Sequence, residues 1–388
     1  MKKLFGLLTF WRAVLIILLA LGLYSTYVRF VHGLGASTNL SDQFPWGLWI
    51  GFDILCGVGL AAGGFTLCAV VYIFNLKAFK PIVRPAVLTA FLGYVLVIFA
   101  LMYDLGRPDR IWHALIMWNP HSVMFEVAWC VMLYTTVLAL EFSPVLFEGL
   151  GWEKPMRFMR TITVPLVIIG VILSTLHQSS LGSLFLIVPE KLHPLWYSPL
   201  LPVFFYVSAI AVGCAMVIFE SFMSSRAFKR QIEMHLLSQI GRAIVVILMI
   251  YMVLRAQDLL DRHALSAAFT LSLESILFWI EVGFGALLPM ALLAIPKVRL
   301  HKTGLFISAL LVVLGFVLNR LNLSITGMEG WAKAGYFPSW MEISVTVMVV
   351  AIGFAVFALA ARYLPVFPQA NGEQKAPMKE EAHVLWAE

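Results

Sequence analysis

Long apolar stretches, separated by short polar connections, run through most of the chain. Each stretch approaches the roughly 20 residues that an α-helix needs to cross the hydrocarbon core of a bilayer. The predicted transmembrane helices cover residues 11–31, 49–75, 85–103, 121–147, 160–182, 201–222, 241–260, 267–295, 304–323 and 340–363. The pattern therefore predicts an all-α polytopic membrane protein with about ten transmembrane helices. We expect two four-helix bundles with further helices at the periphery.

Domain organisation follows from the same pattern. Residues 1–363 are expected to form one transmembrane helical domain, because no long polar segment interrupts them. Residues 364–388 are polar and have no apolar period, so we expect a mobile tail.

The composition supports this interpretation. The chain of 388 residues is 61% hydrophobic and 12% charged, whereas a soluble domain has about 25% charged residues. The sequence has no basic run on a soluble domain, so nucleic acid is not an expected partner. The apolar composition instead predicts that the protein is surrounded by a lipid bilayer.

The basic residues predict the orientation. Of the 27 Lys and Arg residues, 19 fall in the two termini and the even-numbered connections, and 8 fall in the other connections. Positive charge collects on the cytoplasmic side of membrane proteins. Both termini are therefore predicted to be cytoplasmic.

The predicted outer connections are rich in Trp, Pro, Gly and His, as in "DLGRPDRIWHALIMWNPHS" and "PEKLHPLWYSP". An aromatic belt at the membrane interface explains the tryptophans. It does not explain the prolines, glycines and paired charges, which favour folded loops that dock a partner. The candidate docking residues are Arg107, Arg110, His193 and Trp196.

Three ionisable residues fall inside apolar stretches near their predicted outer ends. A charged group at bilayer depth costs roughly 2.5–3.5 kcal/mol on insertion scales, so such groups usually face a cavity or each other. Asp53, Glu126 and His177, with Gln178 beside the histidine, come from three helices and are predicted to lie at one depth. They form either a functional site or a hydrogen-bonded trio that only holds helices together.

Further carboxylates extend these patterns. Glu126 and Glu141 share one stripe of the fourth predicted helix, and Glu274 and Glu281 share a face of the eighth. Such a series is what a proton path needs, and structural ion pairs are the alternative.

Redox centres are not expected in this chain. The four cysteines, Cys56, Cys68, Cys130 and Cys214, all lie in apolar runs without a C-x-x-C motif, which argues against an iron–sulfur cluster or a structural zinc. Of the nine histidines only His177 is clearly inside a helix core, so the two axial ligands of a membrane haem are missing.

Several segments together resemble one known family. The segments "FPWGLWIGFDILCGVGLAAGGF", "HSVMFEVAWC", "LHQSSLGSL", "KLHPLWYSP" and "YFPSWMEI" are similar to the membrane subunits of the polysulfide-reductase (NrfD-type) family. The resemblance covers residues 28–365, with the family core at about 45–323. It is closest to the ten-helix branch, which includes the membrane subunits of type 2 nickel–iron hydrogenase and of the high-molecular-weight cytochrome c complex. The plain outer loops slightly favour the second.

The resemblance implies a function. Such subunits contain no haem, bind a quinone (usually menaquinone) near the outer face, and dock a ferredoxin-like iron–sulfur subunit there. Hydrogenase or multihaem cytochrome c subunits, and further membrane subunits, are the other implied partners, in the bacterial cytoplasmic membrane. Transferred to this chain, the quinone pocket falls on Asp53, Glu126, His177 and Gln178.

The leading hypothesis is therefore a quinone-reactive electron-transfer subunit that is not catalytic alone. His177 is expected to hydrogen-bond one quinone carbonyl, and Glu126 or Asp53 to exchange the proton. The candidate walls of the quinone ring are Trp46, Trp49 and Tyr103. Whether Glu126, Glu141, Glu274 and Glu281 translocate protons stays open. The rival hypotheses are a secondary transporter and a passive membrane anchor.

Overall fold

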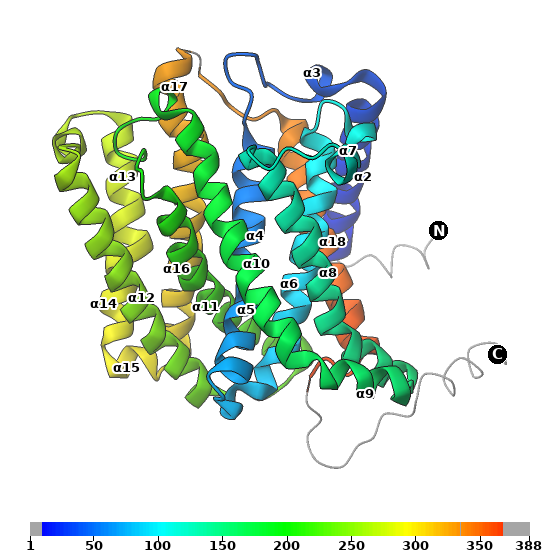
Figure 1. Ribbon diagram of the computed structural model, residues 1–388. Coiled ribbons are helices and arrows are strands. Elements are labelled where there is room, and N and C mark those ends of the chain that lie inside the picture. The colour runs from blue at the N-terminus through cyan, green and yellow to red at the C-terminus, as the bar shows by residue number, and fades with distance from the viewer. Residues whose placement is uncertain (1–9, 334, 368–388) are drawn as a thin grey trace.

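The computed structural model describes residues 10–333 and 335–367 of the chain (Figure 1). Within these ranges every regular secondary-structure element is a helix, and loops and turns connect the helices. Ten of the described helical segments are long and apolar enough to cross a membrane. They cover Ala13–His32, Trp49–Ile73, Lys77–Asp104, Val123–Leu150, Thr163–Ile187, Leu201–Phe228, Met234–Asp261, Leu273–Ala294, Lys302–Ala332 and Trp340–Tyr363. The predicted fold class and the predicted set of helices are confirmed.

The first four-helix bundle contains the second to fifth spans. Its second span is broken into η1 (Trp49–Cys56), α4 (Gly57–Leu60), α5 (Gly63–Cys68) and η2 (Ala69–Ile73), and it is joined by α6 (Lys80–Asp104), α8 (Val123–Leu150) and α10 (Thr163–Ser183). Contacts of α10 with α8, of α8 with α6 and of α6 with α5 hold this bundle together.

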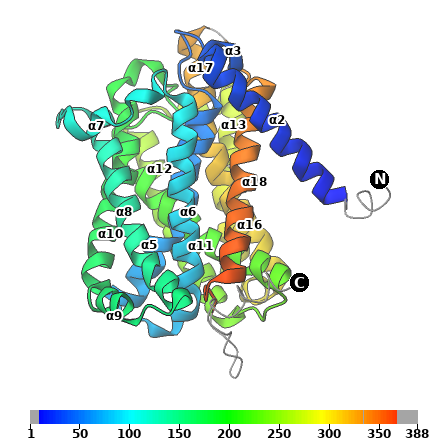
Figure 2. The ribbon, with the colours of Figure 1, turned by 90° about the vertical axis from the view of Figure 1, so that its right-hand side faces the viewer.

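The second bundle contains the sixth to ninth spans. It is built from α11 (Leu201–Phe228), α12 (Met234–Asp261), α13 (Leu273–Val282) with η8 (Gly283–Leu287) and α14 (Leu288–Ala294), and α16 (Lys302–Leu321). Helix α11 also packs on α10 and α5, so it joins the two bundles. Helices α2 (Phe10–His32) and α18 (Trp340–Tyr363) pack on each other at the edge, next to α6 (Figure 2).

Short elements mark the two faces of the molecule. The long-loop face, at the top of Figure 1, carries α3 (Leu34–Ser37), η4 (Pro108–Arg110), α7 (His113–Ile116), η5 (Leu184–Ile187), η6 (Pro189–Lys191), η7 (Leu265–Phe269), η9 (Asn322–Thr326) and α17 (Gly327–Ala332). The short-loop face carries η3 (Lys77–Phe79), α9 (Glu153–Thr161) and α15 (Pro296–Arg299). The Lys and Arg count makes the short-loop face the predicted cytoplasmic one.

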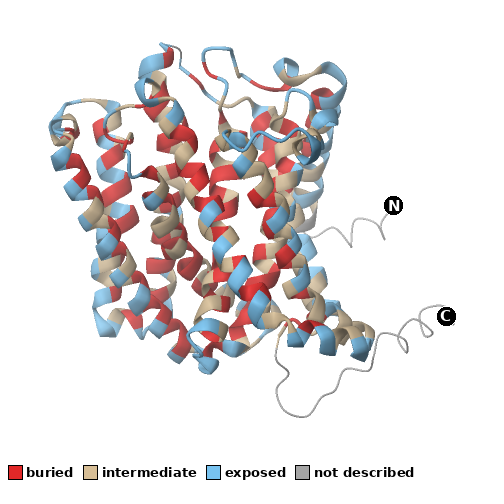
Figure 3. Ribbon diagram, viewed as in Figure 1, coloured by how far each residue is buried: buried red, intermediate tan, exposed pale blue. Residues whose placement is uncertain are grey.

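Small residues allow the closest helix crossings. A Cβ atom on Gly213 of α11 would come within 2.7 Å of the backbone of Ala62 and Gly63, so the two backbones touch where the bundles meet. Small residues at such crossings are typical of membrane helices. Around this contact the residues are buried, whereas large apolar side chains cover the outside of the molecule, as a lipid-facing surface requires (Figure 3).

The packed domain extends four residues past the predicted boundary at residue 363. Val366 is fully buried, the Arg84 side chain donates a hydrogen bond of 2.9 Å to the carbonyl of Pro365, and Phe367 contacts Phe357. Residues 364–367 are therefore part of the bundle. The rest of the predicted tail lies outside the described residues.

We predict that Gly213→Ala destabilises the protein, because the added methyl group must push the backbone of the second span away from α11. Overpacking of this kind costs about 1–3 kcal/mol. Thermal unfolding of the purified chain in detergent measures it. The matched control is Gly330→Ala, whose Cβ would enter open space, and an equal midpoint for both variants would contradict the prediction.

Candidate functional site

Asp53 lies in η1, where the second span is wound as a π-helix rather than an α-helix. Such wider turns are rare and often occur at functional sites. The side chain is 6% exposed and accepts a hydrogen bond of 2.8 Å from the hydroxyl of Thr346 on α18. The carboxylate therefore faces the peripheral helix α18 rather than the interior of the first bundle.

A cavity of about 360 Å³ begins at Asp53 and is lined by α4, α6, α11 and α18. Most of its lining is apolar. A second carboxylate, Glu220 of α11, also lines it and accepts a hydrogen bond of 2.7 Å from Thr89 of α6. The cavity therefore has a buried acidic group, Asp53, and a half-buried one, Glu220, with hydrocarbon between them.

The cavity is elongated along the helices and open at its side. On α18 the lining residues run from Val349 to Ala358, which corresponds to about 14 Å at 1.5 Å per residue. Met223 of α11 and Phe354 of α18 line it and are also exposed on the outer surface. The opening between α11 and α18 therefore faces the surroundings of the bundle.

His177 and Gln178 of α10 lie on the other side of the second span. The His177 Nδ1 atom and the Tyr94 hydroxyl are 2.8 Å apart, and Gln178 donates a hydrogen bond of 3.2 Å to the carbonyl of Val58. His177 is fully buried, and its Nε2 atom has no hydrogen-bond partner among the residues that the structure describes. Because buried polar atoms are normally paired, this nitrogen is available for a proton or a ligand.

Glu126 is in the first turn of α8, and its side chain is exposed on the surface of the bundle. Its carboxylate accepts a hydrogen bond of 2.7 Å from Ser180 of α10. A negative charge at this end of a helix is also favoured by the helix dipole.

The predicted trio is therefore not one hydrogen-bonded site. Glu126 and His177 both belong to the α10 side of the first bundle, whereas Asp53 faces α18 across the second span. The sequence predicted that the three residues lie at the same depth, but depth alone does not determine the direction in which each side chain points from its helix.

The three aromatic residues predicted to wall a quinone ring also lie on two different sides of the second span. Trp46 stacks edge-on against Phe185, on the α10 side. Trp49 and Tyr103 are each 1% exposed and pack against each other near α18, and neither lines the cavity. Their faces are used in core packing, and the prediction that they wall a quinone ring stays a prediction.

Glu141 lies farther along α8, toward the short-loop face. Its carboxylate is 3.9 Å from the Cys68 thiol. Between Glu126 and Glu141 the same helix buries Tyr134, whose ring packs edge-on against Tyr94 at a centroid distance of 4.7 Å. Polar side chains therefore occur at intervals from Glu126 to Glu141.

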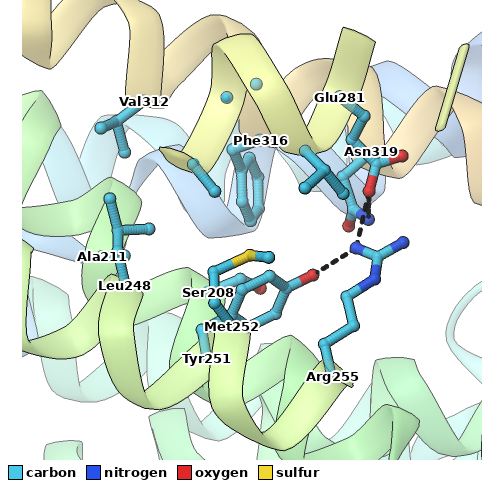
Figure 4. Close-up of a pocket in the computed structure, with 14 residues that line it drawn as sticks. Ser208, Ala211, Leu248, Tyr251, Met252, Arg255, Glu281, Val312, Phe316 and Asn319 are labelled. Atoms are coloured by element: carbon cyan, nitrogen blue, oxygen red, sulfur yellow. Dashed lines mark hydrogen bonds and ion pairs between the residues drawn. The ribbon is translucent and has the colours of Figure 1, made fainter. Parts of the chain in front are cut away.

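A second polar cluster occupies the second bundle (Figure 4). The Glu281 carboxylate is buried and accepts four hydrogen bonds, of 2.6 to 2.9 Å. The donors are Arg255, Trp196, Asn319 and Asn322. A carboxylate held by an arginine and three further donors is a structural ion pair.

Two of the predicted docking residues are not fully exposed on the surface: Trp196 is buried and His193 is half-buried. Trp196 is 3% exposed and its indole nitrogen donates a hydrogen bond to Glu281, so its side chain faces the interior of the second bundle. His193 is half-buried, and burial lowers the pKa of its imidazole, which is therefore neutral at pH 7. Arg107 and Arg110 are exposed on the long-loop face.

Several residues of these sites were missed at the sequence level. Glu220 interrupts the apolar run "VIFESF" in the same way as Glu126 interrupts its own run, so the same argument would have found it. Tyr94 and Thr346 are ordinary members of apolar helices, and no sequence signal identifies them. Across residues 10–333 and 335–367, no group of three or more His, Cys, Asp or Glu side chains could hold a metal ion.

The fold and these sites define a polytopic helical membrane protein of two four-helix bundles, with acidic groups at one apolar cavity. The family model for polysulphide reductase, NrfD, matches residues 36–329, and the chain belongs to this family.

Three relatives align over nearly their whole length. A protein of Nitratidesulfovibrio vulgaris is 42% identical, over 90% of this chain and 92% of the relative. The probable Ni/Fe-hydrogenase 2 b-type cytochrome subunit of Escherichia coli is 37% identical, over 92% and 90%. The menaquinone reductase integral membrane subunit of N. vulgaris is 30% identical, over 92% of each.

We predict that Glu281→Gln lowers the stability of the protein strongly, because it leaves the buried Arg255 without its counter-charge. Breaking a buried ion pair by removing one partner costs about 3–5 kcal/mol. The measurement is the thermal midpoint and the yield of folded protein. Glu274→Gln, on the same helix but partly exposed, is the control. If Glu281→Gln is as stable as the control, the carboxylate is not a structural partner.

Proposed function

We propose that the protein is the quinone-reactive membrane subunit of a respiratory redox complex in the bacterial cytoplasmic membrane. It exchanges electrons between an iron–sulfur subunit on the long-loop face and a quinone, with menaquinone as the expected one. The observation that carries the proposal is the cavity of about 360 Å³, which is apolar, open at its side and ends on the buried carboxylate of Asp53. The name of the menaquinone reductase relative supports the choice of substrate.

The cavity fits an amphipathic substrate of this kind. Ligand pockets have volumes of roughly 300–1,000 Å³ and are mostly apolar, with a few polar groups that orient the ligand. In the proposed arrangement the quinone ring lies at the Asp53 end, and its isoprenoid tail follows α18 and leaves between α11 and α18. The Asp53 carboxylate exchanges a proton with one quinone oxygen, and the Thr346 hydroxyl holds the carboxylate in place.

Electrons must come from or go to another subunit. The proposed docking surface is on the long-loop face, near Arg107 and Arg110, whose exposed guanidinium groups suit an acidic partner. A ferredoxin-like iron–sulfur subunit, itself joined to hydrogenase or multihaem cytochrome c subunits, is the proposed partner.

Proton movement through the first bundle is a separate part of the proposal. Ser180 and Glu126, the pair Tyr94 and His177, and Glu141 supply exchangeable protons along one side of that bundle. Protons that travel this way from the short-loop face would make turnover electrogenic. Glu281 and Glu274 of the second bundle are left out of the proposed path, because the Glu281 charge is already held by Arg255.

A secondary transporter fits less well. Transporters usually bind their substrates near the middle of the membrane, between broken helices. Here Asp53 is the fifth residue of its span, close to the long-loop face. A passive anchor would not need a buried carboxylate at the end of an open apolar cavity.

We predict that Asp53→Asn lowers the rate of quinone reduction by the purified complex about 100-fold or more, the size of effect expected for a lost proton-exchanging group. The complex should still assemble, because the amide keeps the hydrogen bond to Thr346. The control is Asp42→Asn, an exposed carboxylate of the long-loop face between α3 and η1. Full activity of an assembled Asp53→Asn complex would leave the passive anchor as the better explanation.

We predict that Glu141→Gln reduces proton movement per quinone about tenfold or more in liposomes that contain the complex, because an amide cannot take part in proton exchange. A pH-sensitive dye outside the liposomes reports the movement during turnover. Glu153→Gln, exposed on α9 at the same face, is the control. Unchanged proton movement in Glu141→Gln would rule out the path through the first bundle.

A further inference from the structure

The second bundle contains a buried guanidinium without a carboxylate partner. Arg320 is 1% exposed and makes no ion pair within the part of the chain that the structure describes. Its Nη atoms donate to the Asn319 side chain at 2.6 Å, to the Ser208 hydroxyl at 2.8 Å and to the Phe205 carbonyl at 3.4 Å, and the guanidinium stacks on the Phe205 ring. Its Nε atom has no hydrogen-bond partner among the described residues.

Arg255 is a second guanidinium with unused donors. It reaches both Glu281 and the Tyr251 hydroxyl through Nη1 alone, at 2.6 and 2.8 Å. Within the described residues, Nε and Nη2 have no hydrogen bond. Arginine has five N–H donors in a fixed planar arrangement and no acceptor, so the free donors of Arg255 and Arg320 can only be satisfied by an electron-rich atom.

The charges in this cluster do not balance. Arg255 pairs with Glu281, and Arg262 pairs with Asp258. The positive charge of Arg320 is therefore not neutralised by a carboxylate of this cluster. An uncompensated charge away from water is costly. The aromatic rings of Phe205 and Phe316 reduce this cost but carry no negative charge.

A small cavity lies between the two arginines. It has a volume of about 20 Å³ and is lined by Arg255, Asn319 and Arg320, together with Ser198 and Asp258. About 10–15 Å³ is enough for one water-sized particle. A neighbouring cavity of about 40 Å³ shares Arg255 and Asn319 with it, so the site can expand slightly (Figure 4).

We propose that this cavity binds one small monovalent inorganic anion of the chloride type, between Arg255 and Arg320. Such an anion accepts hydrogen bonds from the free guanidinium donors and neutralises the surplus charge, whereas a water molecule does only the first. The surrounding positive charge excludes a cation. The site joins α12, α16 and the loop that carries Ser198, and therefore stabilises the second bundle. It does not depend on quinone binding.

The test is the thermal midpoint of the purified full chain, with the subunits that accompany it, as gluconate is replaced by chloride at constant ionic strength. A ligand that binds only the folded state raises the midpoint. We expect a saturable rise of a few degrees with chloride and with bromide for the wild type and for Arg157→Gln, an exposed arginine of α9 on the short-loop face. Arg320→Gln should show no rise. Absence of a rise in the wild type, or an equal rise in Arg320→Gln, would overturn the proposal.

Two further measurements keep the test decisive if Arg320→Gln does not fold. Ser208→Asp places a carboxylate beside the Arg320 Nη2 atom, so this variant should be insensitive to chloride, and a wild-type response in it would contradict the site. Crystals of the wild type grown in bromide should give an anomalous peak between Arg255 and Arg320. Its absence, in data that locate the sulfur atoms, would mean that the cavity holds only water.

Discussion

The lack of water inside a bilayer is the constraint on which the rest of this structure depends, because each buried polar group must find its partner within the protein. Three acids of the transmembrane helices illustrate how this is done. Thr346 donates to Asp53, Thr89 donates to Glu220, and Arg255 with three other residues holds Glu281. Because each donor belongs to another helix, these few bonds also decide which helices pack together. The hydrogen bonds that satisfy these polar groups therefore also hold the helices of the bundles together.

The two bundles differ in the partners of their polar side chains, which are neutral for the candidate site residues of the first bundle and include arginine in the second. In the first bundle Glu126, Glu141 and His177 each have one neutral hydrogen-bond partner and no counter-charge among the described residues. In the second bundle the Glu281 carboxylate faces an arginine and three further donors, so its charge is held in place. The proposed proton exchange is therefore assigned to the first bundle and to the cavity at its edge with α18. The second bundle supplies a rigid, positively charged support, to which the loop with Trp196 is attached.

Much of the fold could be predicted from the sequence, but the site could be predicted only in part. Apolar length alone located all ten spans, since the thickness of a bilayer sets the length of a helix. Asp53, His177 and Glu126 were singled out because they interrupt apolar runs, yet they do not form one hydrogen-bonded site. Predicted depth fixes position along the membrane normal but not rotation about the helix axis. The π-helical winding of η1, which follows from no simple pattern, changes that rotation at Asp53 itself.

The sequence by itself determined the class of protein, the number of spans and the family, because these depend on composition, length and ordered motifs that need no third dimension. Only the tertiary structure decided which polar groups face one another. Trp196 was expected on a docking surface, and its indole nitrogen donates a hydrogen bond to Glu281, 85 positions away in the chain. Glu220 of α11 meets Thr89 of α6 at the cavity, and Thr346 of α18 meets Asp53 of the second span. Such pairings arise from helix rotation and close crossings, such as that of Gly213 with the second span, and both are properties of the packed bundle rather than of any one helix.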